Sequence, residues 1–411
     1  MYNIGKFVIL WHISKILEGT IVVNALAKLF IKDADNVQSP AVRGAYGTLC
    51  SILGIALNVL LFAGKFFAGT ISKSVSITAD AFNNLSDAGS SVITLIGFKL
   101  AGKKPDPDHP FGHGRMEYLS GLAVSVAILL MGWELATSSV DKIIHPQPVE
   151  FSLVSTAILV VSIAVKLYMG SYNNAIGDKI DSAAMKATGA DCMSDSIATG
   201  VVLAASLVGH FTNLVIDGWC GLLVSFFILR AGVEAAKDTI APLLGRKPDE
   251  DLVKEIFSIV MAHPEVTGVH DLVVHDYGPG RLMITLHAEV SAEEDILYIH
   301  DIIDDIEVEL KETLNCAATI HMDPVAVNDE KVNSLKKMIY ERMVNLFGKD
   351  VNIHDFRIVE GHTHTNVIFD IMVPFGFKYT DGKIVEMIAE DVAKIEGTEY
   401  RSVVTVDHAY V

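Results

Sequence analysis

The chain has 411 residues, of which 51% are hydrophobic and 20% charged, a composition that suits a membrane domain joined to a water-soluble one. The acidic excess behind its net charge of −18 lies in the C-terminal part. Residues 249–411 hold 32 acidic and 13 basic side chains, whereas residues 1–248 hold 18 acidic and 19 basic ones. This acidic balance argues against nucleic acid as a partner, since phosphate binding needs clustered Lys and Arg.

The first segment, residues 1–42, is apolar but interrupted by charge. Lys6, Lys15 and Glu18 divide its apolar residues, so the segment resembles neither a cleaved signal peptide nor a membrane span. We predict an amphipathic helix that lies on the cytoplasmic membrane surface.

Residues 43–245 are predicted to form a transmembrane domain. A helix needs about 20 apolar residues to cross a bilayer. Six stretches of that kind are present, at 47–70, 76–101, 117–140, 151–171, 184–208 and 212–236. Several contain Gly, Ser and Thr, which allow membrane helices to approach one another closely.

Basic residues in the loops predict the orientation of these spans. They gather before the first span, between the second and third, before the fifth and after the sixth: Lys28, Lys32, Arg43, Lys99, Lys103, Lys104, Arg115, Lys179, Lys186, Lys237, Arg246 and Lys247. Because Lys and Arg favour the cytoplasmic side, both termini are expected there.

Beyond the last span the periodicity changes to that of soluble helices and strands. The pattern predicts the order αββαβ in residues 246–327 and again in residues 328–411. Short words recur as well, with VHDL in the first copy and IHDF in the second. We therefore predict two tandem cytoplasmic α+β domains of ferredoxin-like fold that arose by duplication.

Two pairs of polar residues lie inside predicted spans. Asn83 and Asp87 are four residues apart, as are Asp191 and Asp195, so each pair shares one face of a helix. Acids within a span usually mark an ion or proton path, and four converging oxygen ligands suit a divalent cation. The alternative is that these acids pair with a basic residue such as Lys166, or cap a break in a helix.

These features together resemble the cation diffusion facilitator (CDF) family. The resemblance is carried by six spans and by the stretches ADAFNNLSD, DCMSD, FGHGRMEYL and HMDP, and it covers residues 40–325. It implies a homodimer in the lipid bilayer that exports divalent metal ions in exchange for protons by alternating access. Such a protein is no enzyme, and the sequence contains no GxSxG, P-loop or HExxH motif.

The ligand types indicate which ion is carried. Zinc-transporting members of the family generally have His or Asp where this chain has Asn83, and His where it has Asp191. Carboxylate and carbonyl oxygens suit Mn²⁺, whereas imidazole suits Zn²⁺. The set is similar to that of the manganese-exporting branch, which predicts a Mn²⁺/H⁺ antiporter of the plasma membrane. A Zn²⁺ or Fe²⁺ exporter and a membrane-bound metal sensor are the alternatives.

The resemblance also implies metal sites outside the spans. One consists of loop residues Asp106, His109 and His113, which could equally be ordinary hydrogen-bonding groups. A second, dimer-linking site lies in the first soluble domain, and its imidazoles favour Zn²⁺ or another divalent metal that need not be the transported ion. Its expected ligands are His270, His287, His300, His321 and Asp323.

The second soluble domain is predicted to have an incomplete metal set. It retains His354, but Asp370 stands opposite His287 and Asp407 opposite His321. We expect this domain to serve packing, dimer contacts or regulation. The four cysteines are scattered without a CxxC pair, which argues against a disulfide framework or a thiolate zinc site.

Overall fold

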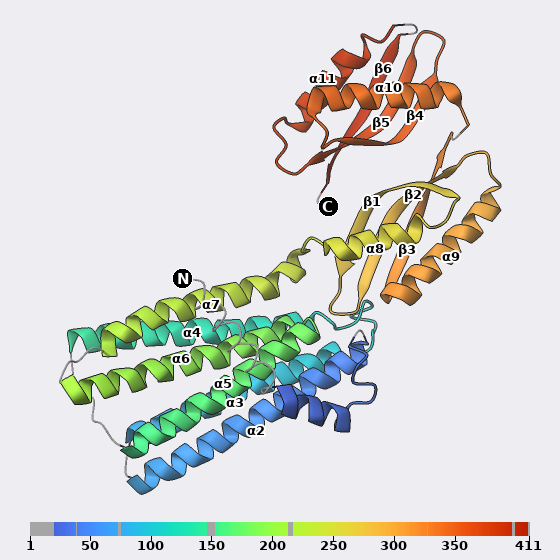
Figure 1. Ribbon diagram of the computed structural model, residues 1–411. Coiled ribbons are helices and arrows are strands. Elements are labelled where there is room, and N and C mark those ends of the chain that lie inside the picture. The colour runs from blue at the N-terminus through green and yellow to red at the C-terminus, as the bar shows by residue number, and fades with distance from the viewer. Residues whose placement is uncertain are drawn as a thin grey trace, which may run out of the picture. The chain divides into compact units, whose positions relative to one another are not determined.

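The computed structural model describes residues 20–37, 39–72, 75–145, 153–212, 217–326, 328–396 and 399–409. The chain divides into two compact units, one of residues 1–246 with 276–281 and the other of residues 247–275 with 282–411 (Figure 1). Each unit is described by itself. Of the predicted amphipathic segment 1–42, residues 1–19 lie outside the described ranges, and Thr20–Phe30 forms a short apolar helix.

The first unit is a bundle of long helices. Their bounds are α2 Pro40–Ser72, α3 Val75–Ala101, α4 Met116–Ile144, α5 Leu153–Lys179, α6 Ala183–Thr212 and α7 Asp217–Leu244. Within the described residues, four of these six are both long and apolar enough to cross a membrane, namely α2, α4, α5 and α7. The prediction of six spans is thus supported for four helices. The other two, α3 and α6, are long enough but carry the polar pairs singled out above.

Small residues let these helices pack closely, as the sequence predicts. A Cβ atom added at Gly121 of α4 would lie 3.0 Å from the Cα atom of Ala184 in α6. Apolar side chains fill the space around such contacts, with Tyr46, Met169 and Tyr172 buried among α2 and α5. The bundle core therefore depends on backbone proximity as much as on bulky side chains.

Residues 276–281, a hairpin tip, belong to the helical unit. Arg115 donates hydrogen bonds to the carbonyl oxygen of Asp276 from Nε at 2.9 Å and from Nη2 at 2.7 Å. The hydroxyl of Tyr118 donates to Oδ2 of the same aspartate at 2.7 Å. A Cβ atom at Gly114 would lie only 2.6 Å from the carbonyl oxygen of Tyr277, so this approach requires glycine.

The second unit contains two modules with the predicted order αββαβ. The first runs α8 Glu250–Val260, β1 Val266–Asp276, β2 Leu282–Ser291, α9 Ile296–Leu314 and β3 Cys316–Val325. The second runs α10 Glu330–Phe347, β4 Asn352–Glu360, β5 Thr365–Pro374, α11 Asp381–Val392 and β6 Tyr400–Ala409. The sheets have the strand orders β1-β2-β3 and β4-β5-β6.

Part of the acidic character of this unit has a structural role. The side chains of Asp249, Asp295 and Asp329 accept hydrogen bonds from backbone N–H groups at the starts of α8, α9 and α10. Such N-caps satisfy donors that have no partner within the helix. Each module then buries one face of its helices in its own apolar core, centred on residues such as Ile256 and Ile284 or Ile339 and Phe369.

Candidate metal sites

Three carboxylates from two helices meet inside the helical unit. Asp87 of α3 and Asp191 and Asp195 of α6 each place one oxygen within 4.8 Å of the others. The spacing of four residues brings the two α6 aspartates to one face of that helix. The structure thus brings together three of the four residues that the sequence predicts for the transport site.

A lysine lies between two of these acids. Nζ of Lys166, on α5, donates to Oδ2 of Asp87 and to Oδ2 of Asp195, both at 2.7 Å. The Lys166 side chain is only 4% exposed, so both are largely desolvated ion pairs. This is the pairing that the sequence left open as an alternative. With all groups ionised, three carboxylates and one ammonium carry a formal charge of −2, which a divalent cation would balance.

Asn83 has a different environment from that expected of a fourth ligand. Its side chain is exposed, whereas the neighbouring Asn84 is 2% exposed. Asn84 precedes Asp87 by three residues, a spacing that also places two side chains on one helix face. Asn84 is not among the candidate ligands predicted from the sequence. Lys166 is named there as a basic partner, but Lys65 of α2, which is buried as well, is not.

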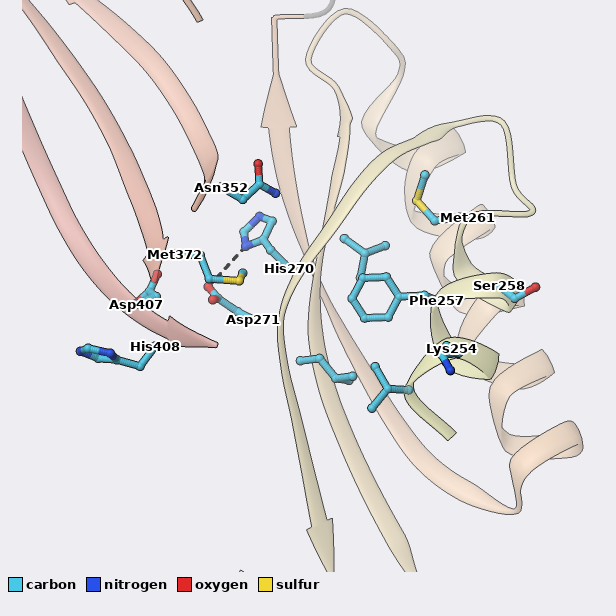
Figure 2. A pocket seen from close by; sticks show the side chains of 13 residues that line it. Lys254, Phe257, Ser258, Met261, His270, Asp271, Asn352, Met372, Asp407 and His408 are labelled. Carbon is cyan, nitrogen blue, oxygen red and sulfur yellow. Dashed lines mark ion pairs between the residues drawn. The ribbon is translucent and has the colours of Figure 1, made fainter. Parts of the chain in front are cut away.

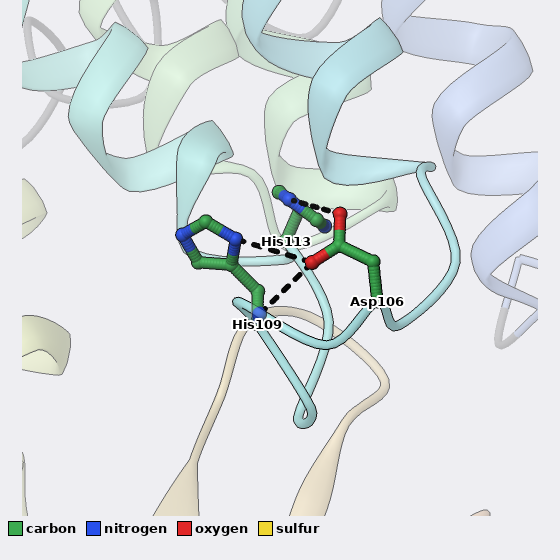
Figure 3. Close-up of side chains that lie close together, drawn as sticks. All are labelled: Asp106, His109 and His113. Atoms are coloured by element: carbon green, nitrogen blue, oxygen red, sulfur yellow. Dashed lines mark hydrogen bonds and ion pairs between the residues drawn. The ribbon is translucent and has the colours of Figure 1, made fainter.

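The loop between α3 and α4 brings Asp106, His109 and His113 together, as the sequence predicts (Figure 3). Nδ1 of His109 lies 3.4 Å from Oδ1 of Asp106, and Nε2 of His113 lies 3.6 Å from Oδ2. The Lys103 ammonium donates to Asp106 at 2.6 Å and holds the pKa of that carboxyl well below its usual value. The loop therefore presents an ionised carboxylate beside two imidazoles.

In the first soluble module three of the five predicted residues form a group that could hold a metal ion, namely His270, His287 and Asp323. A fourth, His321, lies beside Asp323 but belongs to no such group among the described residues. Oδ2 of Asp323 lies 2.9 Å from Nδ1 of His287 and 3.2 Å from Nε2 of His270, and its Oδ1 lies 3.3 Å from Nε2 of His321. The fifth, His300 on α9, is 60% exposed and lies 3.4 Å from Asp304, and it is in none of the metal-ligand groups found among the described residues.

The second module, whose metal set is predicted to be incomplete, contains a group of three residues that could hold a metal ion. His354, Asp370 and Asp407 place ligand atoms within 4.8 Å of one another. The strand register corrects the alignment of the repeats. In the first module His287 pairs with His321, and Asp323 follows His321 by two residues on β3. In the second module Asp370 pairs with Thr405, and Asp407 follows Thr405 by two residues on β6. Asp407 therefore corresponds to Asp323, and not to His321.

Asp271 was not expected among the ligands, and it connects the two modules. Its Oδ2 lies 3.4 Å from Nδ1 of His270, and its Oδ1 lies 3.7 Å from Nε2 of His354. These two imidazoles lower the pKa of the Asp271 carboxyl. Burial lowers the pKa of His354, but Asp271 and Asp407 beside it raise that pKa more, so that the net change is upward.

A pocket of about 700 Å³ opens beside this connection (Figure 2). Phe257 and Met261 of the first module line it with His270 and Asp271, and the second module contributes Asn352, Met372, Asp407 and His408. Three of the residues in the ligand groups, His270, Asp271 and Asp407, thus line the pocket.

Comparison with known proteins identifies the family of this chain. Residues 51–244 match the cation efflux transmembrane domain, and residues 248–325 match the cytoplasmic domain of cation efflux proteins. An uncharacterized transporter of Methanocaldococcus jannaschii is 31% identical over 279 residues, which are 67% of this chain and 97% of the relative. The cation-efflux pumps FieF of Escherichia fergusonii and Cronobacter sakazakii are 28% and 29% identical over 69% of this chain and 95% of their own. This chain belongs to the cation efflux (CDF) family, whose members are transporters and not enzymes.

Proposed function

We propose that this cation efflux transporter exports Mn²⁺ in exchange for protons, with the ion held by Asp87, Asp191 and Asp195. The observation that carries the proposal is the cluster itself, three carboxylates gathered between α3 and α6 inside the helical bundle. Burying such charge is costly unless a cation compensates it. A divalent metal ion supplies that compensation in one state of the cycle.

Lys166 supplies part of the compensation in the state described here. Its ammonium occupies the space between Asp87 and Asp195, where the metal ion would bind. Entry of the ion then displaces the ammonium from both carboxylates. When the ion leaves, the carboxylates take up protons and recapture Lys166, whose single positive charge offsets only part of the charge of the three acids. Metal and protons thus compete for one site, as antiport requires.

The proposed topology has all six long helices crossing the membrane. In α3 and α6 the acids that lower hydropathy lie close to one another, so the cost of burying them is offset inside the bundle. We further propose a homodimer in the plasma membrane, with both termini in the cytoplasm and alternating access to the site. The two soluble modules are proposed to be ferredoxin-like domains.

Oxygen ligands support Mn²⁺ as the ion, because carboxylates suit harder cations than imidazole does. Asn83 is proposed as the neutral fourth ligand in a conformation in which α3 turns its exposed amide toward Asp87. Asn83→His tests this assignment and is expected to raise Zn²⁺ transport relative to Mn²⁺. An unchanged ratio would remove Asn83 from the site and leave selectivity to the three acids.

Flux into liposomes tests the function. Purified full-length protein is compared for Mn²⁺, Zn²⁺ and Fe²⁺ under an imposed pH gradient. Mn²⁺ should move fastest, and Asp87→Asn or Asp195→Asn should abolish uphill movement, whereas Asp178→Asn at the exposed end of α5 should not. Faster Zn²⁺ or Fe²⁺ flux would assign a different ion, and no flux of any metal would favour a membrane-bound metal sensor.

A further inference from the structure

The second soluble module repeats the metal-ligating positions of the first at the level of the backbone. In each module a histidine near the first strand is followed by an aspartate in the left-handed region, with φ 51° at Asp271 and φ 48° at Asp355. Few residues other than glycine adopt this conformation. The same local turn therefore directs His270 and His354 inward from equivalent places.

Both histidines are buried in a way that calls for a ligand. Each is only 5% exposed, and among the described residues none of the four ring nitrogens makes a hydrogen bond, although carboxylate oxygens lie 3.2 Å from Nε2 of His270 and 3.3 Å from Nε2 of His354. A buried polar group left without a hydrogen bond is destabilising. Metal ions bound to one nitrogen of each ring and to these carboxylates would satisfy the two rings, whose centroids are 4.4 Å apart.

The spacing of the surrounding oxygens fits a metal ion. Ligand bonds of about 2.0–2.2 Å hold neighbouring ligand atoms about 2.8–3.1 Å apart in an octahedral site and about 3.3–3.6 Å apart in a tetrahedral one, so carboxylates that bind an octahedral ion here need to move inward by a few tenths of an ångström. Nε2 of His354 lies 3.3 Å from Oδ2 of Asp407 and 3.7 Å from Oδ1 of Asp271. Asp370 adds a third carboxylate to the group.

Asp271 is placed to serve both modules at once. One of its oxygens faces His270 and the other faces His354. Its counterpart Asp355 is engaged instead by Nη1 of Arg357, at 2.8 and 2.7 Å, and has no such role. The two repeats therefore differ at the one residue that would bridge them.

We propose that the second module holds its own divalent cation through His354, Asp370 and Asp407, and that the Asp271 carboxylate bridges this ion to the first module's site. With one imidazole and three carboxylates, the second site suits an oxygen-preferring ion such as Mn²⁺. The first module offers His270, His287 and Asp323 and suits Zn²⁺ better. Metal occupancy then joins the two modules within a single chain.

The site is tested by counting metal on purified full-length protein. Wild type, His354→Gln and Asp407→Asn are equilibrated with Mn²⁺, and bound metal is measured after dialysis. Each variant should retain one ion per chain fewer than wild type. His362→Ala, which removes an exposed histidine of the same module, should retain the wild-type count. Equal counts in wild type, His354→Gln and Asp407→Asn would overturn the proposal.

The bridge is tested separately by electron paramagnetic resonance of protein saturated with Mn²⁺. Two ions joined by Asp271 should give a spin-coupled spectrum in wild type, and Asp271→Ala should give separate, uncoupled ions. A wild-type spectrum without coupling would refute the bridge even if a variant failed to fold. The Asp87→Asn variant should keep the difference in metal count caused by His354→Gln and the spin-coupled spectrum. A failure of the proposed soluble site can therefore be distinguished from a failure of the proposed transport site.

Discussion

Replacing Lys166 with methionine separates the two interactions proposed for the three acids, which are pairing with Lys166 and binding of the metal ion. The substitution preserves much of the side-chain volume but removes both 2.7 Å contacts, to Asp87 and to Asp195. Removing one partner of a buried ion pair costs about 3–5 kcal/mol, because the remaining charges lose their compensation. We expect metal-free Lys166→Met to be destabilised on that scale and to recover stability when a divalent ion binds.

Metal affinity should change in the opposite direction. In wild type the entering ion must displace the ammonium, and the variant has no competitor to displace. If the absence of the competing ion pair makes the free energy of Mn²⁺ binding about 3 kcal/mol more favourable, the Kd for Mn²⁺ falls about 100-fold, since each 1.4 kcal/mol is a factor of ten. Turnover should slow, because an ion that is held more tightly and not displaced by Lys166 leaves more slowly.

Isothermal titration of full-length protein in detergent measures the change in Mn²⁺ affinity, and liposome flux measures the change in turnover. Lys186→Met is the matched control, because Lys186 of α6 is 43% exposed and pairs with Asp178 at 3.1 Å. Weaker or unchanged Mn²⁺ binding by Lys166→Met would refute the competition between ammonium and metal. It would make Lys166 a permanent structural partner of the two acids.

Three further predictions address other parts of the chain. Asp191→Asn should reduce Mn²⁺ flux into liposomes at least 100-fold, while size-exclusion chromatography shows that the protein is still folded. Flux near that of wild type would remove Asp191 from the site. Gly114→Ala should lower the melting temperature of full-length protein, because the added methyl group meets the carbonyl oxygen of Tyr277, whereas Gly44→Ala, with open space around it, should not lower it. Asp295→Ala should cost about 1 kcal/mol by removing the N-cap of α9, and urea unfolding that leaves the midpoint of the second unit unmoved would contradict this.

The sequence predicted the order of elements better than their contacts. Hydropathy and period-two patterns located the long helices and both αββαβ modules, because these signals are local. The count of apolar spans was less secure at α3 and α6, where functional polar residues reduce hydropathy. A local rule fails where function places polar groups in an apolar helix.

The sites were predictable where spacing alone determines proximity. Asp191 and Asp195 are neighbours because residues four apart share a helix face, and His321 and Asp323 share a strand face because residues two apart do. Contacts between residues of different helices or strands could not be predicted from sequence spacing. The strand register aligned Asp407 with Asp323, and helix packing brought Lys166 to Asp87 from 79 residues away. His300 shows the reverse, since a position matched by resemblance lies on an exposed helix face.

Exchange of Mn²⁺ for protons at the three carboxylates can be measured by recording luminal Mn²⁺ and luminal pH together in liposomes that contain the full-length protein. We expect Mn²⁺ added outside to enter while protons leave the lumen, and an acidic lumen to drive Mn²⁺ inward against its own gradient. Mn²⁺ entry that leaves the luminal pH unchanged and ignores an imposed pH gradient would contradict this exchange.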